Sequence, residues 1–122
     1  MKEIHFFSTA TINYFFMIKL ICLSMKKYKN LNYKYIYHIM LETSDLEKYY
    51  NKLKYLETYD FKIDLLDVKL IENKIDKNLK DYDTMRLSYV KCLIPTLFPH
   101  LDKILCLDID LLIFNSGIEN LF

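Results

Sequence analysis

Three short apolar segments of strand character, separated by segments of helical period, constrain the fold of this chain most strongly. Residues 4–8, 33–41 and 61–65 are continuously apolar or alternate in polarity, which is typical of strands. Residues 12–28 are apolar almost all round, which predicts a helix buried on several sides. Residues 46–56 also keep helical spacing. Strands and helices in alternation predict an α/β layer with a largely parallel sheet.

Local signals mark the ends of the predicted elements. Thr9, Ala10 and Thr11 predict a turn after the first strand, and either Thr9 or Thr11 is placed to cap the first helix. The pattern Ser44-x-x-Glu47 is a capping box, so we expect the second helix to begin just after Ser44.

The second half of the chain is less regular. Residues 69–83 are mostly charged, and we expect a surface helix or loop there. Residues 83–98 are expected to be helical until Pro95 and Pro99 break the helix. Residues 103–107 form an apolar run, which predicts the last strand. Because no linker or repeat divides the sequence, we expect one domain, residues 1–122.

The charge balance argues against nucleic-acid binding. The chain has 122 residues, with 17 Lys and Arg against 16 Asp and Glu, so its formal net charge is +1. Basic and acidic residues are interleaved, and Arg86 is the only arginine. A surface that follows a phosphate backbone needs a one-sided excess of positive charge. We therefore expect no nucleic-acid partner.

An apolar run near the N-terminus raises the question of membrane targeting. Residues 12–25 are interrupted by Lys19 and are too short to cross a bilayer. No small-residue cleavage site follows them, so a buried helix explains the run better than a signal peptide does. We expect no transmembrane segment.

The cysteines indicate a reducing compartment. Their odd number and their spacing match neither a disulfide framework nor a metal site. Each lies in an apolar run, so we expect reduced core residues and a cytoplasmic protein. The three cysteines are Cys22, Cys92 and Cys106.

Asp108 and Asp110 follow the last predicted strand and are the strongest candidates for chemistry. Two positions apart on an extended chain, they would present both carboxylates on one face. Like charges held close in an apolar stretch need a shared proton, a cationic partner or a metal ion. Carboxylate ligands favour Mg²⁺ or Mn²⁺, which commonly complete their coordination shell with phosphate oxygens. The alternative is that both aspartates only end the strand and face water.

Two longer runs around this pair resemble a known family. Residues 89–99 read Tyr-Val-Lys-Cys-Leu-Ile-Pro-Thr-Leu-Phe-Pro, and residues 101–110 read Leu-Asp-Lys-Ile-Leu-Cys-Leu-Asp-Ile-Asp. They resemble the Tyr-x-Arg-Leu-x-Ile-Pro-x-Leu-x-Pro and Asp-Lys-x-Leu-Tyr-Leu-Asp-x-Asp motifs of glycosyltransferase family 8, retaining enzymes that use nucleotide sugars. Lys91 stands where the family has arginine, which keeps the charge but loses the planar fork. Arg86 lies upstream, out of register with the prolines. For both residues the alternative is an exposed helix face.

The N-terminus resembles the family's first strand and its Asp-Asp-Asn-Tyr turn more weakly. Asn13 and Tyr14 match, whereas Thr11 and Ile12 stand in place of the two acidic residues. Thr11 could replace one hydrogen bond to the base, or it could serve only as a helix cap. The resemblance implies that residues 8–14 line a nucleoside pocket. The candidate contacts there are Thr9, Thr11, Asn13 and Tyr14.

The resemblance implies the Rossmann-like, nucleotide-sugar-binding half of a GT-A-type domain. The implied reaction transfers a hexose from a UDP-sugar donor to a saccharide or lipooligosaccharide acceptor, with retention of configuration. Asp108 and Asp110 would hold Mn²⁺ or Mg²⁺ against the diphosphate. Lys91 and Ile109 would contact the nucleotide sugar, and Ser88 and Tyr89 would lie near the same cleft.

The resemblance covers only the first part of the family's domain. The sequence contains neither the acceptor-binding region nor the late His-x-x-Gly-x-x-Lys-Pro-Trp motif, whose histidine also binds the metal; His5, His38 and His100 cannot be mapped onto it. We therefore expect a truncated fragment whose catalytic residues are unknown. The alternative is an inactive module that binds nucleotide weakly, self-associates or docks onto a partner chain. Peripheral attachment to the inner face of the membrane is a further option for its location.

Overall fold

Four parallel strands form one sheet in the part of the chain that the computed structural model describes, residues 1–79, 81 and 87–122. The strands lie in the order β3-β2-β1-β4, which confirms the predicted α/β class and gives a Rossmann-like arrangement. The strands are β1 (Lys2–Thr11), β2 (Tyr33–Glu42), β3 (Phe61–Asp67) and β4 (Leu105–Cys106).

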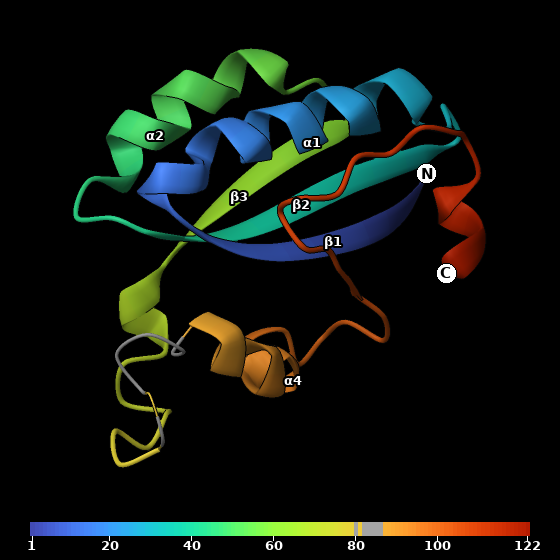
Figure 1. Ribbon diagram of the computed structural model, residues 1–122. Coiled ribbons are helices and arrows are strands. Elements are labelled where there is room, and N and C mark those ends of the chain that lie inside the picture. The colour runs from blue at the N-terminus through green and yellow to red at the C-terminus, as the bar shows by residue number, and fades with distance from the viewer. Residues whose placement is uncertain (80, 82–86) are drawn as a thin grey trace.

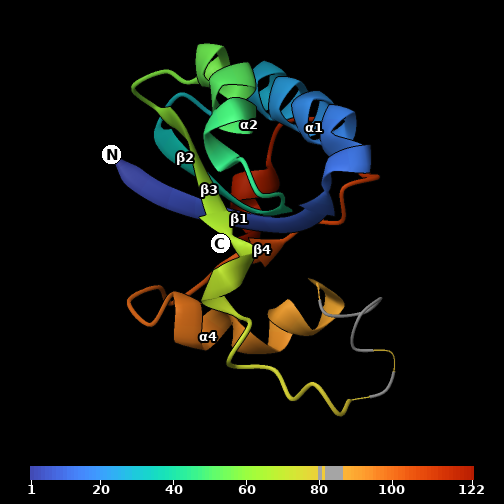
Figure 2. The same ribbon diagram turned by 90° about the vertical axis from the view of Figure 1, so that its left-hand side faces the viewer.

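Helices pack on both faces of this sheet (Figures 1 and 2). The first two, α1 (Phe15–Tyr28) and α2 (Leu46–Leu53), connect successive strands and cover one face. The short helix α4 (Ile94–Leu97) lies on the opposite face and precedes β4. Short 3-10 turns complete the described elements: η1 (Ile12–Tyr14), η2 (Lys54–Leu56), η3 (Val68–Leu70), η4 (Val90–Leu93) and η5 (Ile118–Leu121).

The alternation of side chains along β1 and β2 builds two cores. Phe6, Tyr35 and Tyr37 belong to the core under α1 and α2. Phe7 and Met40 belong to the core on the α4 side. These side chains are almost completely buried, and burial of an apolar side chain of this size stabilises the fold by roughly 1.5–3 kcal/mol. The period-2 pattern of residues 33–41 therefore placed β2 correctly.

Helix α1 is buried on one face only, which corrects the expectation of burial on several sides. Phe16 and Leu20 are 56% and 46% exposed, because the sheet lies against only one side of the helix. The buried residues of α1 are Phe15, Ile18, Ile21, Cys22 and Met25. Within the described ranges, no helix has both the length and the apolar character that a membrane span requires.

Two predicted boundaries differ from the structure. Thr9–Thr11 are not a turn: β1 continues to Thr11, which pairs with Glu42 of β2. The N-cap of α2 is Asp45 rather than Ser44, and its carboxylate accepts the backbone N–H of Lys48 at 3.1 Å. The negative charge of this carboxylate also interacts favourably with the helix dipole.

Pro95 begins a helix instead of breaking one. It lies in the first turn of α4, where a helix needs no N–H donor. The helix ends at Leu97, before Pro99. In the segment predicted as one helix, residues 83–98, the described residues 87–89 are α-helical, and η4 and α4 follow them without a break. Residues 83–86, including Arg86, lie outside the described residues.

The last strand is much shorter than predicted. β4 pairs with β1 at two positions only, Phe6 with Leu105 and Phe7 with Cys106. The location of the cysteines also differs from the expectation: Cys22 is buried, but Cys92 and Cys106 are exposed, and all three are free thiols. Cys106 is exposed because β4 lies at the edge of the described sheet. Burial raises the pKa of the Cys22 thiol to about 12, so it acts as a packing residue.

Candidate functional site

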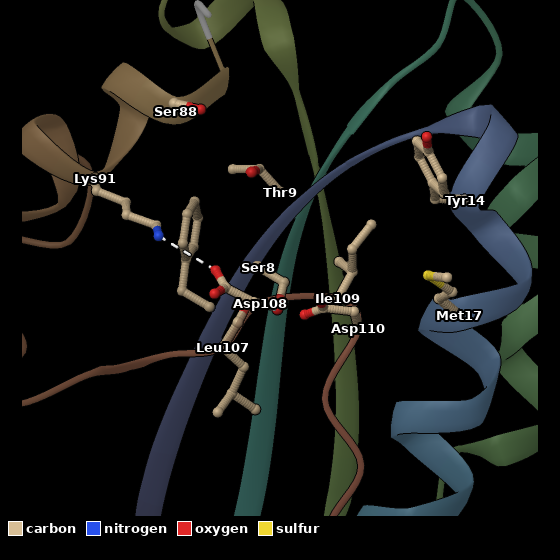
Figure 3. A pocket seen from close by; sticks show the side chains of 11 residues that line it. Ser8, Thr9, Tyr14, Met17, Ser88, Lys91, Leu107, Asp108, Ile109 and Asp110 are labelled. Atoms are coloured by element: carbon tan, nitrogen blue, oxygen red, sulfur yellow. Dashed lines mark hydrogen bonds and ion pairs between the residues drawn. The ribbon is translucent and has the colours of Figure 1, made fainter.

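A cavity of about 440 Å³ lies beyond the carboxyl ends of β1 and β4 (Figure 3). In parallel α/β sheets this is the usual place for a ligand. Strand β1, the start of α1, the turn around η4 and the loop after β4 all contribute to its walls. The lining residues are Phe7, Ser8, Thr9, Tyr14, Met17, Ser88, Lys91, Leu107, Asp108, Ile109 and Asp110.

Residues 107–111, which we call the acidic loop, bring both aspartates to this cavity. The Leu107 N–H donates to the Phe7 carbonyl at 2.8 Å, which is the last backbone hydrogen bond to β1. The Leu111 N–H then donates to the Asp108 carbonyl at 3.2 Å and closes a turn. The aspartates therefore lie in a turn, not on an extended strand as predicted, because pairing with β1 has already ended.

Both aspartates are exposed, which corrects the expectation that the apolar neighbours desolvate them. The two carboxylates nevertheless lie in the same cavity, opposite Tyr14 and Met17 (Figure 3). They are thus neither on a convex surface nor remote from the end of β1.

Lys91 forms an ion pair with Asp108. Its Nζ atom lies 3.4 Å from Oδ1 of Asp108, and the two side chains are 53% and 69% exposed. An exposed pair of this kind contributes at most about 1 kcal/mol to stability. Its significance is its position, since η4 places a cation directly beside the first carboxylate of the cavity.

Of the four predicted nucleoside contacts, the structure places two at the cavity and two outside its lining. Thr9 and Tyr14 line the cavity, with the Tyr14 ring half exposed. Thr11 and Asn13 are not among the lining residues. Thr11 occupies the N-cap position of η1, but its side chain makes no capping hydrogen bond. The proposed cap function of this side chain is therefore not observed.

The donor set can be compared with the needs of a divalent cation. Among the described residues, no group of three or more His, Cys, Asp and Glu side chains is arranged to hold a metal ion. Asp108 and Asp110 supply two carboxylates to this cavity. This set suits Mg²⁺ or Mn²⁺, which keep several positions for water and phosphate oxygens. It does not suit Zn²⁺, whose sites use three or four protein ligands.

Sequence reasoning missed some of the cavity wall. Met17 projects into it from the first turn of α1, and Phe7 lines it from β1. Neither position carries a signal, because an apolar residue in an apolar helix or strand predicts only core. Ser88, by contrast, was expected near the cleft and does line the cavity, opposite the acidic loop, whereas Tyr89 is not among the lining residues.

No family model matches this chain, and no curated protein matches it. What the cavity binds must therefore be inferred from its own residues.

Proposed function

We propose that this chain binds a UDP-sugar through a divalent cation, as the nucleotide-binding part of a family 8-like retaining glycosyltransferase. One observation supports this most: Asp108, Asp110 and Lys91 converge on a single cavity at the carboxyl ends of the strands. Two carboxylates and one ammonium group suit a metal-bound diphosphate better than a neutral ligand. The resemblance of residues 89–110 to the family's paired motifs supplies the class of ligand.

The cavity has a polar side and an aromatic side. Asp108 and Asp110 would supply oxygen ligands to Mn²⁺ or Mg²⁺, and the bound cation would neutralise charge on the departing diphosphate. Lys91 would place a further positive charge beside the phosphates. Thr9 and Tyr14 would contact the nucleoside with hydroxyl groups and an exposed ring face. Hexose transfer to a saccharide or lipooligosaccharide acceptor, with retention, is proposed from the resemblance alone.

Calorimetric titration of UDP in the presence and absence of Mn²⁺ tests the proposal. Binding should require the metal and should be lost in the Asp108→Asn and Asp110→Asn variants. Asp102→Asn is the matched control, because Asp102 is also exposed but lines a different cavity. UDP binding that is independent of Mn²⁺, or that survives both cavity substitutions, would overturn the proposal.

A second candidate function, docking onto a partner chain or another copy, is favoured by an exposed apolar surface. The Ile113 N–H donates to Ser24 Oγ, so the segment after the acidic loop lies along α1. Phe16 and Leu20 on α1, which are 56% and 46% exposed, line a shallow hollow together with Leu111 and Leu112. Contiguous apolar surface of this kind commonly marks an interaction site. Light scattering over a concentration series would reveal self-association as a rising mass, whereas a constant monomer mass would exclude a second copy.

A further inference from the structure

Two buried hydroxyl groups connect the centre of the sheet to the acidic loop. The Tyr37 hydroxyl of β2 donates to Ser8 Oγ of β1 at 2.6 Å, and the Ser8 hydroxyl donates to the Leu107 carbonyl oxygen at 2.7 Å. Tyr37 and Ser8 are 0% and 2% exposed. The chain of hydrogen bonds thus begins in the core under α1 and ends one residue before Asp108.

The direction of both hydrogen bonds follows from the chemistry of the groups. A carbonyl oxygen can only accept, so the single hydroxyl hydrogen of Ser8 is committed to Leu107. The Ser8 oxygen is then the acceptor for the Tyr37 hydroxyl. Burial raises the pKa of Tyr37, which keeps its hydroxyl protonated as the donor. Among the described residues, no buried side-chain nitrogen or oxygen lacks a partner, so the network is complete.

The acidic loop has few other attachments. β4 pairs with β1 at two positions only, and the Leu107 N–H adds one further hydrogen bond to Phe7. Lys91 donates an exposed hydrogen bond to Asp108. Within the described part of the chain, this is the hydrogen bond that connects residues 108–110 to another element. The Leu107 and Ile109 side chains also pack against the core under α1. Because the Asp108–Lys91 pair is exposed and weak, the contact at the Leu107 carbonyl is, among the described residues, the buried side-chain hydrogen bond that restrains where the loop turns.

We propose that Ser8 and Tyr37 are positioning residues, which orient the acidic loop so that both carboxylates enter the same cavity. Ser8 fixes the Leu107 peptide plane, and Tyr37 fixes the Ser8 rotamer. That the carboxylates bind a cation and a diphosphate rests on the function proposed above. The proposed orientation of the loop does not depend on that function. Ser8 would therefore affect ligand binding through its hydrogen bond to Leu107, although its side chain also forms part of the cavity wall.

Amide hydrogen exchange followed by NMR tests the positioning directly and requires no ligand. In Ser8→Ala and Tyr37→Phe, exchange of the Leu107 and Leu111 amides should accelerate about twofold to tenfold, the effect of losing one net hydrogen bond. The amides of Tyr35 and Phe98, which donate to the carbonyls of Asp60 and Ile94, should not change. Ser8→Thr keeps the hydroxyl and should restore slow exchange.

Tyr50→Phe is the matched control, because the Tyr50 hydroxyl also makes a short hydrogen bond, to Glu57 at 2.7 Å, but far along the chain from the acidic loop. It should leave the Leu107 and Leu111 amides unchanged. If Ser8→Ala does not fold, Tyr37→Phe still decides the question, since it removes a single oxygen atom. Exchange at the acidic loop that is the same in wild type and both variants overturns the inference.

Metal affinity separates this inference from the proposed function. Titration with Mn²⁺ and UDP should show about twofold to tenfold weaker binding in Tyr37→Phe than in wild type, with Tyr50→Phe unchanged. Faster loop exchange with unchanged affinity would show that the hydroxyls only stabilise the loop, and this overturns positioning. Absence of binding in wild type would overturn the proposed function, and the exchange rates would still decide the role of Ser8 and Tyr37.

Discussion

The imidazole Nδ1 of His5 lies 3.0 Å from Nε2 of His38, and the two ring planes are within 8° of parallel. His38 Nδ1 in turn lies 2.7 Å from Oδ2 of Asp64. The three residues come from β1, β2 and β3, so the hydrogen bonds run across the sheet on its α4 side. The Phe98 ring, just after α4, lies against His38 with ring centroids 4.5 Å apart.

The distances restrict which ring nitrogen atoms of His5 and His38 donate a hydrogen bond and which accept one. With Asp64 ionised, His38 donates from Nδ1 and accepts at Nε2, and His5 then donates from Nδ1. His5 Nε2 is left without a proton and faces Glu3 at 3.6 Å. If both facing nitrogen atoms carried protons, two N–H groups would face each other across 3.0 Å, so one nitrogen of this contact donates and the other accepts.

We predict that acid weakens the fold through His5. Burial, and then the neighbouring His38, lower the pKa of His5, with smaller lowering effects of His100 and Lys34 and an opposing effect of Glu3. The folded state therefore binds fewer protons than the unfolded state, so stability falls as the pH decreases below about 6.5, the usual histidine pKa. Urea unfolding at pH 7.5 and 5.5 measures the loss.

The matched variants for this prediction are His5→Gln and His100→Gln. His5→Gln should reduce the difference in unfolding free energy between the two pH values. His100→Gln should largely preserve it, because His100 is exposed and is not part of the hydrogen-bonded chain. Equal pH dependence in wild type and His5→Gln would contradict the assignment.

The sequence predicted those parts of the fold in which a local pattern of polarity follows directly from burial. Tyr35, Tyr37 and Ile39 alternate with other residues because β2 lies between two layers, and the alternation is visible in the sequence. The acidic loop is different. Where β4 ends depends on how far it pairs with β1, and no residue between Leu105 and Asp110 signals that limit.

Contacts between side chains on different strands also could not be predicted from the sequence. His5, His38 and Asp64 are separated by 33 and 26 positions, and they meet only because of the parallel register. The same holds for Ser8 and Leu107, which are 99 positions apart. Spacing along the chain identifies residues that share one helix or strand, but it does not identify neighbours on different strands.

The second prediction concerns the pair formed by Lys29 and Asp60, whose charged groups lie 2.8 Å apart and are largely buried. The hydrogen bond from Lys29, followed by one from Thr58, lowers the pKa of Asp60. Lys29→Met should therefore destabilise the protein by about 1.5–3 kcal/mol, the usual effect of losing a hydrogen bond to a charged group. Chemical denaturation at pH 7 measures the difference.

The pH dependence of the same variant is a second test. Because the pKa of Asp60 is lowered in the folded state, its contribution is present at neutral pH and is lost as the pH falls below about 4. The difference between wild type and Lys29→Met should therefore shrink in acid. Lys27→Met, at the exposed end of α1, is the control and should cost less than about 0.5 kcal/mol. A similar loss in both variants would refute the role of the pair.

The third prediction compares two adjacent residues of α1. Ile21 is 1% exposed in the core and Leu20 is 46% exposed. Ile21→Ala should cost about 2–5 kcal/mol, because it leaves a cavity, whereas Leu20→Ala should change the unfolding free energy by less than about 0.5 kcal/mol. Thermal and urea unfolding of the two variants measure this. Comparable losses would mean that the outer face of α1 is covered in solution.

The fourth prediction uses Lys91 to separate its two effects on the cavity. In the metal-free protein, Lys91 neutralises Asp108, so Lys91→Met should strengthen the binding of Mn²⁺ alone. With UDP present, the loss of a positive charge beside the diphosphate should weaken binding of the nucleotide by about tenfold to 150-fold, the range for a charged hydrogen bond. The unfolding free energy should change by less than about 1 kcal/mol, because the pair is exposed.

The control is Lys77→Met. Lys77 is another exposed lysine but lies outside the cavity, so both affinities should stay unchanged. Weaker binding of Mn²⁺ alone would show that Lys91 organises Asp108 for the metal instead of competing with it.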